Sequence, residues 1–263
     1  MKRTLSAGLA TGLLMFGMTG LAIADDINLS SWSEYTYDLS GGQTAGNWDL
    51  SGGNTAVTQT INADPSVYLN NLNQTSYQMD GQWKVTTASD DDFMGFVFGY
   101  QDDSHFYVMD WKQSYQNAGG GYGTANEGFR ILKINADSVT DLDIGDFWES
   151  GTTESTILES NLGSGKGWAD NTLYDFHLGF DPGTFSILVS KNGTTLWDVT
   201  VTDNTYQSGQ FGFYNYSQAS VQYAGFEQTG GVIVDPVPEP ATMILFGTGL
   251  VGLVGFRLRK KKK

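Results

Sequence analysis

The sequence predicts an all-β protein built as a sandwich or a barrel. Across residues 25–232, short runs of aromatic and β-branched residues alternate with clusters of Gly, Asn and Asp, a pattern typical of strands joined by turns. The same region lacks a sustained helical period, and it contains no repeat of fixed length. Since 40% of the 263 residues are hydrophobic and 13% are aromatic, a core of this kind can be buried.

The expected strands follow from these runs in chain order. They are 56–61, 76–87, 93–101, 106–113, 128–134, 173–180, 185–190, 196–201, 209–215 and 221–227. The nearly continuous apolar run 93–98 indicates a strand covered on both faces, as in the middle of two stacked sheets. Asn192-Gly193 predicts a hairpin turn, because this pair tolerates the positive φ that tight turns need. Residues 117–124, with three consecutive glycines, are expected to form a long flexible loop.

The N-terminus has the pattern of a secretory signal peptide over residues 1–24. Lys2-Arg3 provides the charged start, and residues 9–21 form a short apolar run with glycines. Ala22 and Ala24 place small residues at the cleavage positions. The folded domain is therefore expected over 25–230, followed by a linker at 231–236.

The C-terminus carries a second address signal over residues 237–263. Val237-Pro238-Glu239-Pro240 precedes the uncharged apolar stretch 241–256, and a basic tail follows at 257–263. As a helix this stretch would span about 24 Å, slightly less than a hydrocarbon core of about 30 Å, with the basic tail on the cytoplasmic side. This order resembles the PEP-CTERM sorting signal of Gram-negative bacteria. The resemblance implies transient anchoring in the inner membrane, cleavage by an exosortase-type membrane protease, and delivery to the cell envelope or exterior; a permanent single-span anchor is the alternative.

Composition excludes several classes of function. Residues 25–240 hold six basic and 29 acidic residues, a formal charge of −23, which argues against binding of nucleic acid and favours attraction of divalent cations. Because the chain has no cysteine, disulfides, a thiolate zinc site and a cysteine nucleophile are excluded. Only two histidines, His105 and His177, are present, which argues against a multi-histidine metal centre.

One segment carries a family resemblance. The run Asp90-Asp91-Asp92-Phe93-Met94-Gly95-Phe96-Val97-Phe98-Gly99-Tyr100-Gln101 is similar to the signature strand of the thrombospondin C-terminal domain. Matching residues continue at the family's spacing through 106–113, and the resemblance covers about 47–228. It implies a jelly-roll sandwich of the legume-lectin and concanavalin type that binds calcium and serves matrix and cell-surface contacts. This sequence contains neither the calcium-rich type 3 repeats nor the cysteines of thrombospondins, so partner functions tied to those parts are not carried over.

The acidic triplet Asp90, Asp91 and Asp92 is the candidate metal site. Two unit charges 4 Å apart repel by about 4 kcal/mol at an effective dielectric near 20, so adjacent carboxylates need solvent or a cation. Ca²⁺ takes six to eight oxygen ligands in irregular geometry, and the resemblance supports calcium here; a water-exposed acidic turn is the alternative. Asp102 and Asp103 lie in the next hairpin, where a turn function is favoured and a second ion is conceivable. The alternating acids of 141–146 lack a complete EF-hand loop and are expected in a solvated loop.

The aromatic residues could stack on sugar rings, but most are expected in the core. Tyr115 and Tyr122 flank the glycine-rich loop and are therefore the candidate ligand contacts. A sandwich of this class can also be a glycoside hydrolase, which needs a pair of carboxylates across the scissile bond. Neither Glu-x-Asp-x-Glu nor Gly-x-Ser-x-Gly occurs in the sequence.

We therefore expect an exported, calcium-binding, non-enzymatic adhesion module whose partner is an extracellular glycan or a matrix protein. An envelope glycoside hydrolase and a purely structural matrix protein are the alternatives.

Overall fold

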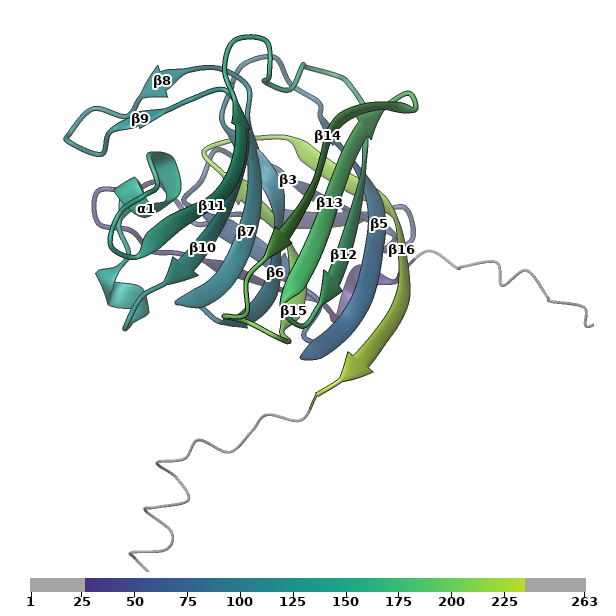
Figure 1. Cartoon of the computed structure of the whole chain (residues 1–263). Coiled ribbons are helices and arrows are strands. Elements are labelled where there is room, and N and C mark those ends of the chain that lie inside the picture. The colour runs from purple at the N-terminus through teal and green to yellow at the C-terminus, as the bar shows by residue number, and fades with distance from the viewer. Residues whose placement is uncertain (1–26, 235–263) are drawn as a thin grey trace, which may run out of the picture.

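The computed structural model describes residues 27–234, which form two seven-stranded antiparallel sheets packed face to face (Figure 1). The first sheet has the order β1 (Ser33–Thr36), β4 (Ser66–Leu69), β15 (Gln210–Tyr216), β6 (Phe93–Asp102), β7 (His105–Lys112), β10 (Gly128–Asn135) and β11 (Ser155–Leu162). The second has the order β14 (Thr194–Thr202), β13 (Thr184–Lys191), β12 (Tyr174–Asp181), β5 (Gln74–Val85), β16 (Val221–Ile233), β3 (Ala56–Gln59) and β2 (Trp48–Ser51). The predicted all-β, lectin-like jelly-roll fold is confirmed.

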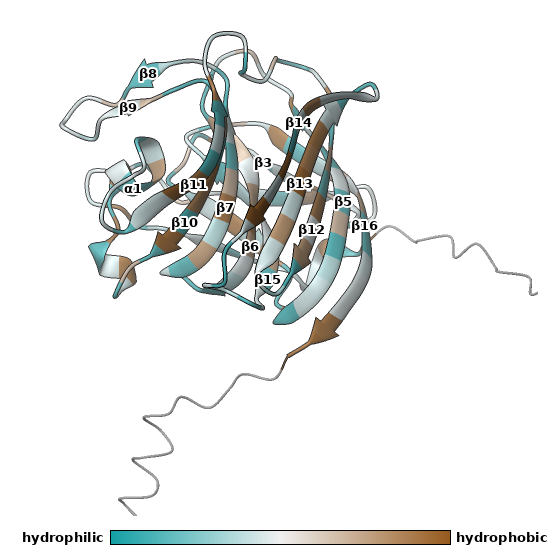
Figure 2. Cartoon of the chain, viewed as in Figure 1, coloured by the Kyte–Doolittle hydropathy of each residue, from teal (hydrophilic) through white to brown (hydrophobic). Residues whose placement is uncertain are grey.

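The main core lies between the two sheets and is dominated by aromatic side chains. Along β12, buried residues alternate with half-buried ones, because successive side chains of a strand point to opposite faces. Trp83 of β5 stacks on Phe176 of β12 with ring centroids 4.8 Å apart. Figure 2 shows the corresponding apolar bands across β12 and β13.

The first sheet is covered on its outer face as well. In β6, the side chains of Met94, Phe96 and Phe98 join the core between the sheets, whereas Phe93 and Val97 join a second core. That second core lies under residues 37–39 and the short helix α1 (Ile144–Trp148). The prediction that this strand is covered on both faces is confirmed, but loops and a helix, not another sheet, supply the second cover.

Close contact between β6 and β7 requires a residue without a side chain at Gly95. A Cβ atom placed there would lie 1.9 Å from the carbonyl oxygen of Met109 in β7. The glycine in the signature strand therefore permits the strand pairing itself.

Several local expectations need correction. The acids of 141–146 belong to the 3₁₀ helix Val139–Asp141 and to the start of α1. There Asp143 and Asp146 form a capping box and Asp146 is buried, because the unpaired amides at the start of a helix need acceptors. The glycine-rich loop contains a hairpin of β8 (Gln116–Asn117) and β9 (Thr124–Ala125). Strand β16 continues to Ile233 by pairing with β5, so residues 231–233 of the expected linker belong to the sheet. The sequence analysis also missed β1, β2, β4, β11 and the 3₁₀ helix Leu29–Ser31.

The signal peptide with Ala22 and Ala24, the sorting motif Val237–Pro240 and the apolar stretch 241–256 lie outside the described residues. Between residues 27 and 234, none of the helices is long and apolar enough to span a bilayer.

Candidate functional site

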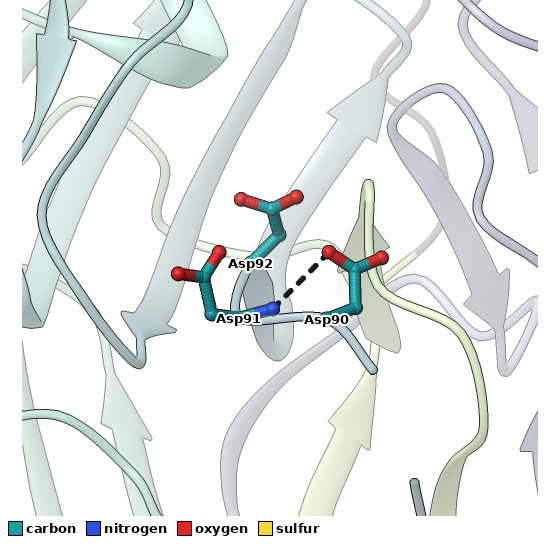
Figure 3. A group of neighbouring side chains, drawn as sticks. All are labelled: Asp90, Asp91 and Asp92. Carbon is teal, nitrogen blue, oxygen red and sulfur yellow. Dashed lines mark hydrogen bonds between the residues drawn. The ribbon is translucent and has the colours of Figure 1, made fainter. Parts of the chain in front are cut away.

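The three aspartates that precede β6 converge at one end of the sandwich. One carboxylate oxygen from each of Asp90, Asp91 and Asp92 lies within 4.8 Å of the others, and Figure 3 shows the three side chains rising from the same side of the chain. The backbone amide of Asp91 donates to Oδ1 of Asp90 over 3.1 Å, which fixes the Asp90 side chain against the backbone of the segment. Among residues 27–234, this is the one group of three or more acidic or histidine side chains with such spacing.

A buried lysine lies within this acidic cluster. Lys112, at the end of β7, places its Nζ 2.5 Å from Oδ1 of Asp92 and 3.6 Å from Oδ1 of Asp91. The same ammonium donates to the Asp91 carbonyl and to Oε1 of Gln116. Strand pairing brings this about, because Phe93 and Lys112 are direct partners in the β6–β7 ladder. Sequence analysis missed the lysine, since it lies 20 residues beyond Asp92.

Burial and mutual repulsion perturb the carboxylates. Burial, followed by the charge of Asp92, raises the pKa of Asp90 to about 6. Burial also raises the pKa of Asp92, although the adjacent Lys112 opposes the shift. The cluster is therefore costly to ionise as it stands, and a further cation would relieve that cost.

The donor set fits a hard divalent cation. Three carboxylates and one ammonium leave a formal charge of −2, which one Ca²⁺ would neutralise. The hydroxyl oxygen of Ser114 lies next to Asp91, to which it donates, and Asn62 donates its side-chain N–H to Asp90 over 2.6 Å. Carboxylate, amide and hydroxyl oxygens are the ligands that calcium prefers. Asp90, Asp91 and Asp92 would therefore hold the ion, with Lys112 as a fixed partial counter-charge.

A cavity of about 250 Å³ opens beside the acidic cluster, outside the first sheet. Its walls come from the loop at 41–43, the β8–β9 hairpin, α1 and the end of β15. Residues that line it include Gln43, Gln116, Tyr122, Trp148, Tyr216 and Ser217. Figure 1 shows α1 and β8–β9 beside β10 and β11.

Two hydrogen-bonded chains connect the acidic cluster to this cavity. On one side Asn62, which holds Asp90, accepts from Ser217 over 3.2 Å, and Ser217 accepts from Gln43 over 2.8 Å. On the other side Lys112, which holds Asp92, donates to Gln116 over 3.0 Å. Hydrogen bonds therefore link the aspartates to two walls of the cavity.

Of the two predicted ligand contacts, only one belongs to the cavity. Tyr122 lines it, whereas Tyr115 is 61% exposed and is not part of its wall. Trp148 and Tyr216 are buried, as expected for most of the aromatic residues, yet each also lines the cavity.

The second predicted pair of acids lies at the other end of β6. Asp102 accepts from the amide and hydroxyl of Ser104 and pairs with Nδ1 of His105 at 2.8 Å. Asp103 accepts from the hydroxyl of Tyr35 over 3.0 Å. These contacts belong to the β6–β7 turn, and the structure does not bring Asp102 and Asp103 to the acidic cluster.

A further acid, the partly buried Asp203, follows β14 and bonds to two strands of the first sheet at a distance from the candidate site. It accepts from the hydroxyl of Tyr107 over 2.5 Å and from Nζ of Lys133 over 2.9 Å. Burial alone would raise the pKa of Asp203, but hydrogen bonds from Thr205, Tyr107 and Lys133 outweigh it and lower the pKa below its ordinary value.

The fold and the acidic end together define a lectin-like β-sandwich with a candidate divalent-cation site. Residues 43–229 match the thrombospondin C-terminal region, and residues 236–260 match the PEP-CTERM protein-sorting motif. The chain therefore belongs to the thrombospondin C-terminal family, and the sorting motif indicates an exported protein directed to the cell envelope.

Relatives of known name agree with this assignment. The chain is 31% identical over 190 residues to thrombospondin-2 of Bos taurus, an alignment that covers 68% of this chain and 16% of that protein. It is 28% identical over 201 residues to cartilage oligomeric matrix protein of Bos taurus, covering 73% and 26% respectively. The chain thus spans about a sixth to a quarter of the length of these relatives. A carbohydrate-binding module from Bacillus subtilis is a solved structure with a similar fold, at 10% identity and a TM-score of 0.47, covering 73% of this chain and 98% of that one.

Proposed function

We propose that this protein is an exported, calcium-binding, non-enzymatic adhesion module that binds a glycan or a matrix polymer at the cell envelope. Calcium bound by Asp90, Asp91 and Asp92 orders the adjacent loops, and these loops present the ligand-binding surface. The sorting motif supports processing by an exosortase-type protease after transient anchoring in the inner membrane.

The convergence of the three carboxylates around a buried ammonium carries the calcium part of this proposal. Extracellular calcium modules bind with dissociation constants of about 10⁻⁴ to 10⁻³ M. At 10 mM calcium, binding of this strength adds about 1.4–2.7 kcal/mol to the free energy of unfolding. For a domain of this size that corresponds to a rise in melting temperature of about 3–11 °C.

Thermal unfolding with 10 mM calcium or with excess chelator tests the calcium site. The wild-type chain should melt higher with calcium, and the double variant Asp90→Asn/Asp91→Asn should lose that difference. Asp92 is left intact in this variant because it balances the buried Lys112. Asp103→Asn, the same chemical change at the opposite end of β6, should keep the full difference. Equal melting temperatures for the wild type under both conditions would remove calcium from the proposal.

Incubation of the chain with envelope and matrix polysaccharides tests the binding function. Co-sedimentation with at least one insoluble polysaccharide in calcium, without release of reducing ends, is the expected result. Release of reducing ends would instead assign the chain to the glycoside hydrolases, and no retention on any polysaccharide or matrix protein would favour a purely structural protein.

A further inference from the structure

The cavity next to the acidic cluster combines aromatic and neutral polar walls. Tyr122, Trp148 and Tyr216 contribute aromatic rings, and Gln43, Gln116 and Ser217 contribute amide and hydroxyl groups. None of the described residues that line it carries a charge, although the surrounding domain is strongly acidic. Such a wall selects an uncharged ligand that has both an apolar face and hydroxyl groups.

One wall residue has an unsatisfied donor. The side chain of Trp148 lines the cavity, the residue is only 4% exposed, and its indole Nε1–H has no hydrogen-bond partner among residues 27–234. Buried polar groups almost always have a partner. Because this nitrogen is shielded from solvent, the N–H does not face the open cavity, and Trp148 contributes an apolar ring to the wall.

The walls are held in place before any ligand arrives. The backbone amide of Gln43 donates to Oδ1 of the buried Asp64 over 2.8 Å. A Cβ atom at the neighbouring Gly42 would lie 2.2 Å from that same oxygen, so the loop and Asp64 are in close contact. Helix α1 is fixed by Arg130, which donates to the carbonyls of Phe147 and Trp148. Because the polar groups are already oriented, little side-chain entropy is lost on binding.

Tyr122 supplies the aromatic part of the wall that comes from the β8–β9 hairpin, and it packs against the second core. It lies at the tip of the β8–β9 hairpin, which it closes by donating its amide to the carbonyl of Gly119 over 3.0 Å. Both Gly121 and Gly123, which flank it, have positive φ, so the hairpin places a single aromatic ring over the cavity without neighbouring side chains.

We propose that this cavity binds one neutral pyranose ring, as the terminal unit of a glycan, with Tyr122 stacked on the ring. The inference rests on the proposed glycan-binding function and names the ligand class of that function. A volume of about 250 Å³ is below the range of about 300–1,000 Å³ typical of drug-sized ligands, which suits a single ring better than a longer oligosaccharide.

Saturation-transfer NMR on the full-length chain tests the proposal, in calcium and in a detergent without a sugar headgroup. The probes are D-glucose, D-galactose, D-mannose and N-acetyl-D-glucosamine, with D-glucuronate as the charged comparison. At least one neutral sugar should bind, and glucuronate should bind more weakly than its neutral counterpart, glucose.

Three variants locate the binding. Tyr122→Ala should weaken the affinity about fivefold to tenfold, the size of one lost aromatic contact. Trp148→Phe replaces the indole by a smaller aromatic ring and so reduces the apolar contact, and a drop of about twofold to tenfold is expected. Tyr115→Ala removes a tyrosine of the same hairpin region that lies outside the wall and should bind like the wild type. Melting temperatures of all three variants show whether the fold is intact.

Each outcome decides between the two proposals. Absence of binding for every neutral sugar, or an affinity unchanged in a folded Tyr122→Ala variant, overturns the pyranose site. If calcium still raises the melting temperature and the chain still sediments with a polysaccharide, the adhesion function stands and its ligand binds elsewhere. Preference for glucuronate over the neutral sugars overturns the ligand class.

Discussion

Replacing Lys112 with methionine should destabilise the calcium-free protein and at the same time strengthen its binding of calcium. The side chain of Lys112 is 1% exposed and that of its partner Asp92 is 4% exposed, with Nζ and Oδ1 2.5 Å apart. Methionine retains most of the volume of the lysine stem but lacks the ammonium, which lies over the rings of Phe93 and Trp148, 5.1 and 4.8 Å from their centroids. The change therefore removes the charge more than the packing.

The magnitude follows from the burial of the pair. Removal of one partner of a buried ion pair costs about 3–5 kcal/mol, because the other charge stays buried without compensation. Calcium should gain affinity, since an ammonium about 4 Å from a second cation costs about 4 kcal/mol or more at an effective dielectric near 20. We expect at least a tenfold lower dissociation constant, which corresponds to about 1.4 kcal/mol.

Urea unfolding in chelator measures the stability, and calorimetric titration measures the calcium affinity. Urea is preferable to guanidinium, whose ionic strength screens the charges under test. The matched control is Lys166→Met, which removes the same charge from an exposed side chain. The double variant Lys112→Met/Asp92→Asn should recover part of the lost stability, because no uncompensated charge remains buried.

The reasoning would be refuted if Lys112→Met and Lys166→Met unfolded at the same urea concentration in chelator. An unchanged or weaker calcium affinity in Lys112→Met would equally contradict the account of Lys112 as a counter-charge within the calcium site.

Three further predictions concern the sandwich itself. Asp203→Asn should lower the free energy of unfolding by about 1–3 kcal/mol at pH 7, because it disrupts charge-assisted hydrogen bonds. Since the pKa of Asp203 is lowered in the folded state, this contribution is complete above the ordinary value of 3.8 and is lost below it. The difference in free energy of unfolding between wild type and Asp203→Asn, measured in urea, should therefore narrow as the pH falls from 4 towards 2. A difference that stays constant over this range would contradict the assignment. Arg130→Met should lower the free energy of unfolding by about 3–5 kcal/mol in thermal or urea unfolding, since it leaves the fully buried Asp110 unpaired. The double variant Arg130→Met/Asp110→Leu should recover part of that stability. Equal losses in the single and the double variant would argue against a charge effect. Gly95→Ala should cost about 3 kcal/mol, the upper end for overpacking, because its Cβ would meet the Met109 carbonyl; a melting temperature within a degree of wild type would exclude that close contact.

Much of the fold could be predicted because its signals are local. Alternation of buried and half-buried side chains in β12 and β13 is visible in the sequence as a period of two. The turn between β13 and β14 was predicted from Asn192-Gly193, and both residues have positive φ, 50° and 75°. Short strands such as β1, β2 and β4, with four residues each, carry too few residues for a periodic signal.

The candidate site could be predicted only in part. Three consecutive aspartates are evident in any reading of the chain, and their proximity follows from adjacency. Tyr122 was named from its place beside the glycines, and it does line the cavity. Tyr115 has the same sequence context, yet it lies outside the cavity wall, because the direction of a side chain on a turn depends on backbone torsions that the context does not specify.

By itself, the sequence determined the class of sandwich, the family, the sorting motif and the acidic triplet, since these depend on residues close together along the chain. Only the tertiary structure decided that Lys112 neutralises Asp92 and that segments near 43, 116, 148 and 217 enclose one cavity. The physical reason is strand register: a shift of one residue in the β6–β7 ladder would turn Lys112 to the opposite face of the sheet, and that register is fixed by the packing of both sheets together.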